Sequence, residues 1–119
     1  TDAETLASRR DVLRSAATAA GRDPESILIS FAGPAMVFDT EAEHIADLER
    51  RAERREMTVA DYTAMIDERS VPHGLPDQAH AAMERLASLG VGRYYVQEYA
   101  SLDDVDIARM ERIFTALRG

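Results

Sequence analysis

The stretch from Ser70 to Tyr99, SVPHGLPDQAHAAMERLASLGVGRYYVQEY, decides the fold that we predict for this chain. Pro76 stands at a first helical position, where its missing N–H costs nothing, and Asp77 adds negative charge at the positive end of the helix dipole. Gly90 ends this helix, and a short aromatic and β-branched strand follows at residues 94–96. A helix that leads directly into a buried strand is half of a parallel α/β unit. The apolar face of the helix consists of Ala79, Ala82, Met83, Leu86 and Leu89.

A second buried strand is predicted upstream, at Ile27–Phe31, because a continuous apolar run is bounded there by turn residues. Gly33 and Pro34 interrupt the run, and Gly33 fits a β-bulge. The following segment, residues 35–38, either extends the strand or forms a bent continuation. The sequence therefore predicts two strands that are covered on both faces.

Four further helices are predicted, at residues 3–20, 41–56, 59–68 and 102–118, which gives the order α-β-α-α-α-β-α. Thr40 and Glu43 form a capping box, Thr58 caps the next helix, and Ser101 or Asp103 caps the last. Asp47 is placed on the outer, solvated face, within reach of Arg51 at i+4. The residues expected to face the core include Leu6, Leu13, Ile45, Leu48, Ala52, Val59, Tyr62, Met65, Ile66, Ile107, Met110, Phe114 and Leu117.

The composition excludes several classes of function. The 119 residues carry a net charge of −8, and an acidic chain without a basic stripe is poorly suited to nucleic acid or an anionic membrane. The absence of cysteine excludes disulfides and thiol catalysis, and it fits a cytoplasmic protein. No apolar run approaches the roughly 18 residues of a membrane span. We therefore expect a cytoplasmic protein with a small-molecule substrate and no nucleic-acid or membrane partner.

Three motifs carry a resemblance: Gly74-Leu75-Pro76-Asp77-Gln78, the helix end Leu89-Gly90-Val91, and the strand Arg93-Tyr94-Tyr95-Val96-Gln97. With them the chain resembles, from about Leu13 to Leu117, the C-terminal end of the luciferase-like monooxygenase family. Leu75 stands where that family usually has a helix-capping Thr or Ser, so one capping hydrogen bond, worth about 1 kcal/mol, is missing.

The resemblance implies an α/β fold, namely a C-terminal fragment of a (β/α)8 TIM barrel with its last two strands and their flanking helices. It also implies FMN or the 8-hydroxy-5-deazaflavin coenzyme as cofactor of a longer parent protein. The family's catalytic residues come from earlier strands and loops, so no catalytic residue can be assigned here. We expect the isolated chain to be inactive and to hold no cofactor.

Candidate binding residues follow from the rule that ligands of parallel α/β folds lie at the carboxyl ends of the strands. Gly33 marks that end of the first strand, where a glycine lets a ligand approach the backbone. Gln97 and Glu98 mark it on the second strand, and we predict that they line the rim of a cofactor pocket. The alternative makes Gly33 a bulge and the other two ordinary loop residues.

The three histidines do not predict a metal site. His44 and His80 lie on predicted helices without a second histidine at i+4. His73 precedes a helix and can donate to an anion there, but we favour a solvent-facing side chain, because glycine-containing turns tolerate any polar neighbour. No motif for nucleophilic catalysis or dinucleotide binding is present.

Two functions remain open at this point. The chain is either a portion of a luciferase-like flavin- or deazaflavin-dependent oxidoreductase that acts on a small organic substrate, or a non-catalytic α/β interaction module that self-associates. An upstream coding region with about 200 further residues in strand–helix alternation would favour the first.

We predict that the chain is a homo-oligomer. Ile27–Phe31 and Tyr94–Val96 are too apolar for exposure, yet within one chain they can pair only with each other. Phe31, Tyr94 or Tyr95, and Val96 should lie in or near the contact. Sedimentation equilibrium should therefore show at least a dimer. A monomer at high micromolar concentration with a cooperative thermal transition would contradict this, and would point to helix 59–68 as a cover over the strands.

Overall fold

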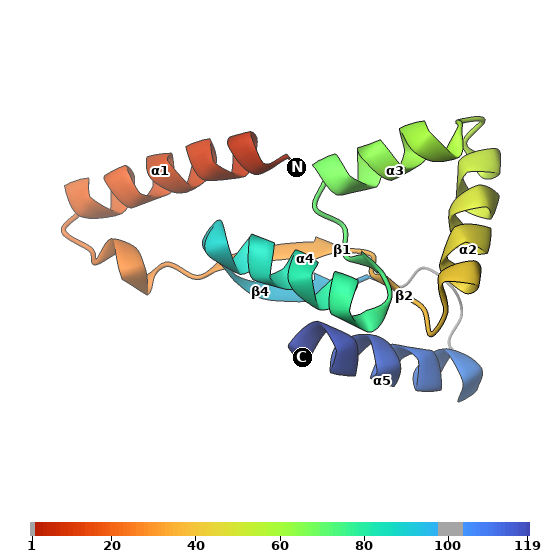
Figure 1. Cartoon of the computed structure of the whole chain (residues 1–119). Helices are drawn as coiled ribbons and strands as arrows, with labels where there is room; N and C mark the ends of the chain where they lie inside the picture. Colours follow the sequence, from red (N-terminus) through yellow and green to blue (C-terminus); the bar gives the residue numbers. More distant parts are fainter. Residues whose placement is uncertain (1, 98–103) are drawn as a thin grey trace.

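The computed structural model describes residues 2–97 and 104–119, which form five α-helices, one 3-10 turn and four short strands (Figure 1). The molecule measures 50 × 31 × 25 Å, with α4 packed over the central strands and α1 extending to one side. In chain order the elements are α1 (Ala3–Ala19), η1 (Pro24–Ser26), β1 (Ile29–Gly33), β2 (Met36–Val37), α2 (Glu41–Arg54), α3 (Val59–Glu68), β3 (His73–Gly74), α4 (Pro76–Ser88), β4 (Val91–Val96) and α5 (Asp104–Arg118). No helix of the described part is long and apolar enough to cross a membrane.

The strands form two parallel pairs. β1 pairs with β4, so that Phe31 lies beside Tyr94 and Gly33 beside Val96. β2 pairs with β3, with Met36 beside His73. The sequence does not predict two of these strands as separate elements. It predicts that residues 35–38 extend the first strand or form a bent continuation of it, and it predicts a loop at His73–Gly74. Strands of two residues have no periodicity of their own, and each exists here because the other supplies its hydrogen bonds.

The predicted C-terminal fragment of a TIM barrel is wrong. The described residues form a small α/β arrangement of two separate two-stranded parallel sheets, and they contain no closed barrel. A barrel requires a continuous, staggered ladder around its circumference. The hydrogen-bond ladder is divided here instead, because β1 pairs with β4 while β2 pairs with β3. The broader prediction of an α/β fold with parallel strands is confirmed.

The irregularity in the longer sheet lies near its start and not at Gly33. The register shifts between Ile29 and Ser30, where Gly92 on β4 is passed over. A Cβ atom on Gly92 would come within 2.6 Å of the end of the Leu28 side chain, so a larger residue at this position would require the exposed Leu28 side chain to move. Gly33 is the regular last residue of β1, which removes its predicted role as a bulge.

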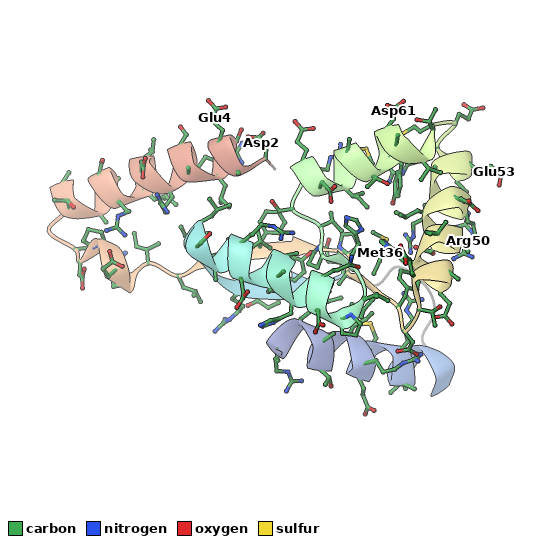
Figure 2. All side chains as sticks on the ribbon, viewed as in Figure 1. Asp2, Glu4, Met36, Arg50, Glu53 and Asp61 are labelled. Atoms are coloured by element: carbon green, nitrogen blue, oxygen red, sulfur yellow. The ribbon has the colours of Figure 1, made fainter. Side chains whose placement is uncertain are left out.

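Three small hydrophobic clusters hold the elements together. Met36 of β2 points into the space between the sheets and α2 (Figure 2), where it meets residues of α2 and α3. A second cluster packs α5 against α4, and a third packs α1 and α4 against the β1–β4 sheet. Their buried members are Met36, Leu48, Ala52, Tyr62 and Ile66; Ala35, Ala79, Ile113 and Leu117; and Leu6, Leu86 and Val91.

The helix starts agree with the sequence better than the buried faces do. The Thr40–Glu43 capping box is present in both directions, and the Thr58 hydroxyl accepts from the Asp61 amide at 3.1 Å. The predicted cap at Ser101 or Asp103 lies outside the described residues. Several residues expected in the core are exposed instead, because α5 turns Ile113 inward and α2 turns Asp47 and Leu48 inward. These exposed residues are Leu13, Ile45, Val59, Ile107 and Phe114.

The two adjacent tyrosines of β4 differ in environment, as the alternation of a strand requires. The Tyr94 ring stacks on Phe31 with ring centroids 5.8 Å apart, and its hydroxyl donates to the Pro34 carbonyl at 2.7 Å. Burial raises the pKa of the Tyr94 hydroxyl, which keeps it protonated as a donor. Tyr95 is 51% exposed.

Tyr62 and Ile66 of α3 pack on Met36 of β2, so α3 covers the shorter sheet.

Leu75 provides a stability prediction. It is the N-cap of α4, its side chain makes no capping hydrogen bond, and only the reverse bond exists, from the Leu75 amide to Gln78 Oε1 at 2.8 Å. We expect Leu75→Thr to raise the free energy of unfolding by about 0.5–1 kcal/mol, because a hydroxyl satisfies one further amide of the first turn. Urea denaturation measures this. A lower midpoint would mean that the packing of the half-buried Leu75 side chain outweighs the cap.

Candidate functional site

The main concave site lies between α2, α5 and the first turn of α4, beyond the carboxyl end of β2. We call it the α2–α5 cavity. Its volume of about 920 Å³ falls in the range of small-molecule sites. Ligands of parallel α/β folds lie beyond the carboxyl ends of strands, and Phe38 and Asp39 follow β2 directly at this position. The apolar wall comes from Met36, Val37, Phe38 and Ala116, and charged side chains, including Asp39, Glu43, Asp47, Arg50, Arg51 and Arg112, complete it.

Asp47 is the central charged residue of this wall. It is only 4% exposed, and its carboxylate accepts from Arg50 and, at 2.6 Å, from Nε of Arg51. Helical spacing explains the arrangement, because residues three and four positions further on lie on the same face. The prediction that Asp47 belongs to the outer, solvated face is therefore wrong. The i+4 pair with Arg51 is visible in the sequence, but the burial of the Asp47 carboxylate is not.

A second ion pair spans the cavity mouth. Nη1 of Arg112 on α5 lies 2.9 Å from Oδ2 of Asp39, which follows β2. Both side chains are well exposed, so this pair contributes little to stability but places a cation and an anion at the entrance. At the opposite end of α5, the His80 ring contacts the Leu117 carbonyl through Nδ1 at 3.2 Å. The cavity therefore combines an apolar floor with alternating charges around it.

The sequence-predicted site residues lie elsewhere. Gly33 and Gln97 meet at the carboxyl end of the β1–β4 sheet, where the backbone N–H of Gln97 donates to the Gly33 carbonyl at 2.8 Å. A Cβ atom on Gly33 would lie 3.0 Å from the Tyr94 hydroxyl, so the close neighbour of this glycine is a side chain of the same sheet. Neither residue lines the α2–α5 cavity. Glu98 lies outside the described residues, and a role of the three at a pocket rim stays a prediction.

The structure also brings two histidines together that the sequence analysis treated as unrelated. Nε2 of His44 on α2 lies 3.0 Å from Nδ1 of His73 on β3, and Nε2 of His73 lies 2.6 Å from Oδ1 of Asp67 on α3. Burial, followed by the neighbouring His73, lowers the pKa of His44, so its ring is uncharged at neutral pH. His73 is therefore not the solvent-facing side chain considered from the sequence, since its side chain is 13% exposed.

Comparison with known proteins gives one informative result. No protein-family model matches the chain, and no curated protein matches it. Among solved structures, the chain is similar to the monooxygenase RslO1 from Streptomyces bottropensis, with a TM-score of 0.71 and 22% sequence identity. The similarity covers 96% of this chain and 37% of that protein. At this identity the likeness is one of fold alone.

Asp47 provides the prediction for this site. We expect Asp47→Asn to lower the free energy of unfolding by about 1–3 kcal/mol, because the amide replaces a buried charge-assisted acceptor and directs N–H groups at two guanidinium groups. Urea denaturation measures the loss. Glu49→Gln is the matched control, since it neutralises an exposed carboxylate on the same helix and should change stability by less than about 0.5 kcal/mol. Equal effects of the two variants would show that the buried pair adds nothing.

Proposed function

We propose that this chain forms part of a luciferase-like, flavin- or deazaflavin-dependent monooxygenase that acts on a small organic substrate. The observation that carries the proposal is the fold similarity to a monooxygenase along 96% of the chain. The motifs around Pro76, Gly90 and Tyr94 support it independently, because they resemble the same broad class of enzyme. The chain spans 37% of that neighbour, so the activity belongs to a longer protein that includes these residues.

In this proposal the α2–α5 cavity supplies one wall of the substrate site. Its apolar floor of Met36, Val37 and Phe38 suits a hydrophobic substrate body. The exposed ion pair of Arg112 and Asp39 at the mouth can orient a polar substituent by exchanging one of its own contacts for a contact with substrate. The task of these residues is to bind and orient the substrate and to exclude water, while the cofactor supplies the redox chemistry when bound.

The cavity fits a flavin only in part. Its volume and its apolar floor suit an aromatic ring system. The phosphate of FMN, however, requires free cationic donors, and here Arg50, Arg51 and Arg112 are already paired with Asp47 and Asp39. The described residues therefore offer a wall beside a cofactor and no complete cofactor cradle. FMN and the 8-hydroxy-5-deazaflavin coenzyme fit this role equally well.

The first test concerns cofactor binding. We expect the 119-residue chain alone to bind FMN no more tightly than the micromolar range, and the complete protein to bind FMN or the deazaflavin coenzyme. When the cofactor is FMN, the complete protein should consume oxygen once reduced FMN and a substrate are supplied. Fluorescence titration and an oxygen electrode measure these two properties. Sub-micromolar FMN binding by the chain alone would refute the expectation of an incomplete site. A complete protein that neither binds a flavin nor consumes oxygen would refute the proposed function.

A pair of tryptophan variants tests the cavity itself within the complete protein. Ala46 and Ala42 are both exposed residues of α2, but only Ala46 lines the cavity. We expect Ala46→Trp to lower kcat/KM about tenfold or more by filling the substrate space, which corresponds to at least about 1.4 kcal/mol of lost transition-state stabilisation. Ala42→Trp should leave kcat/KM unchanged. Equal effects would place the substrate site outside this cavity.

A further inference from the structure

Two imidazole rings from distant parts of the chain meet at the shorter sheet. Nε2 of His44 and Nδ1 of His73 are 3.0 Å apart, and the ring planes are inclined by 44°. Twenty-nine positions separate the two residues in the sequence, so only the fold joins them. His44 comes from α2 and His73 from β3, beside the entry into α4.

The spacing of the two nitrogens is that of two ligands on one metal ion. Metal–imidazole bonds of about 2.0–2.1 Å, opened by roughly 90° to 110° at the metal, place adjacent ligand nitrogens about 2.8–3.4 Å apart. The observed 3.0 Å lies inside this interval. A hydrogen bond also fits this distance. The residues that orient the two rings favour metal binding by the pair.

Asp67 fixes the orientation of His73. Its Oδ1 lies 2.6 Å from Nε2 of His73, and a carboxylate accepts the proton on that nitrogen. Nδ1 of His73 then carries the lone pair, which points at His44. A carboxylate that orients a histidine in this way, behind the ring and away from the metal, recurs in protein metal sites because it fixes the tautomer and raises the basicity of the ligand.

His44 is held as well. Its ring stacks on Phe38, with centroids 5.6 Å apart and planes inclined by 25°. When the neutral ring carries its proton on Nε2, it donates to His73. When the proton moves to Nδ1, both facing nitrogens carry lone pairs, and a rotation of the two rings directs these lone pairs at a common point beside the line that joins the nitrogens, where a cation can lie. Metal binding therefore needs a change of tautomer at His44 and a rotation of the rings.

An adjoining cavity of about 300 Å³ provides room for water ligands. Its lining includes both histidines, Asp67, Gln78 and Arg85. Asp67 adds negative charge near the rings, whereas Arg85 opposes a cation. No group of three or more His, Asp or Glu side chains in the described residues is arranged to hold a metal, so the protein contributes two nitrogen ligands and water completes the shell.

We propose that His44 and His73 form a two-histidine site for a divalent transition-metal ion, oriented by Asp67. Imidazole ligands without carboxylate or thiolate in direct contact favour Cu²⁺, Ni²⁺ and Zn²⁺ over Mg²⁺ and Ca²⁺. Cu²⁺ binds most tightly of the divalent series at such a site. The site joins α2 to β3, so the bound ion stabilises this half of the molecule by linkage. It is independent of the proposed monooxygenase function.

Copper titration followed by calorimetry and electron paramagnetic resonance tests the site. We expect one Cu²⁺ per chain, with spectral splitting from two nitrogens, and a higher melting temperature in the presence of Zn²⁺. His44→Asn and His73→Asn should each weaken Cu²⁺ binding at least tenfold. Asp67→Asn keeps both ligands and changes a well-exposed residue, and it should weaken binding by about tenfold to a hundredfold.

The third histidine supplies the matched control. His80 lies on α4 against the Leu117 carbonyl and Glu84, away from the pair, so His80→Asn should leave Cu²⁺ affinity unchanged. Circular dichroism verifies that each variant is folded. Cu²⁺ binding that is equally strong in folded His44→Asn and His73→Asn, or that is lost only in His80→Asn, would overturn the proposal. So would the absence of any binding to the unaltered chain, which would leave a hydrogen bond as the whole role of the contact.

Discussion

Pro34 imposes the constraint on which the rest of the structure depends. A proline has no N–H and cannot donate a hydrogen bond to a neighbouring strand, so the ladder that begins at β1 must end there. The carbonyl of Pro34 accepts a hydrogen bond from the Tyr94 hydroxyl at 2.7 Å, and the Gly33 carbonyl accepts one from the backbone N–H of Gln97 at 2.8 Å. Beyond the proline the chain turns to a new partner, since Met36 donates to the Pro72 carbonyl at 2.9 Å. One break thus produces two sheets, and it directs Phe38 and Asp39 toward α2 and α5.

Local signals in the sequence predicted the elements well. The capping residues Thr40 and Thr58, proline at the first position of α4 and glycine at its end each act through neighbours within a few positions, so a single sequence contains the necessary information. The helix 59–68 was confirmed to the residue for the same reason. The strand 27–31 was placed within two residues of its observed bounds.

The architecture and the sites depended on contacts that local signals do not contain. β2 and β3 have two residues each and form only because they meet. The TIM-barrel fragment was predicted from the resemblance to a family of barrels, but similar motifs do not determine which strands pair. Asp47 looked like a solvated residue because its neighbours in sequence are charged, and its burial beside these side chains becomes visible only in the folded structure. The pairing of His44 with His73 has the same origin, since α3 and the turn after it return the chain to α2.

The attachment of α1 has a consequence for how the molecule opens. Only Leu6 and Ala17 of this helix are buried, and Arg10 joins it to the end of α4 through a single hydrogen bond to the Leu89 carbonyl at 3.2 Å. Such a helix can separate from the body without disturbing the clusters around Met36 and Ile113. Its amides should then exchange with deuterium at a much lower free-energy cost than those of α4. A protease that requires an unfolded segment would cut first in the connection between α1 and β1, and would leave the two parallel sheets intact.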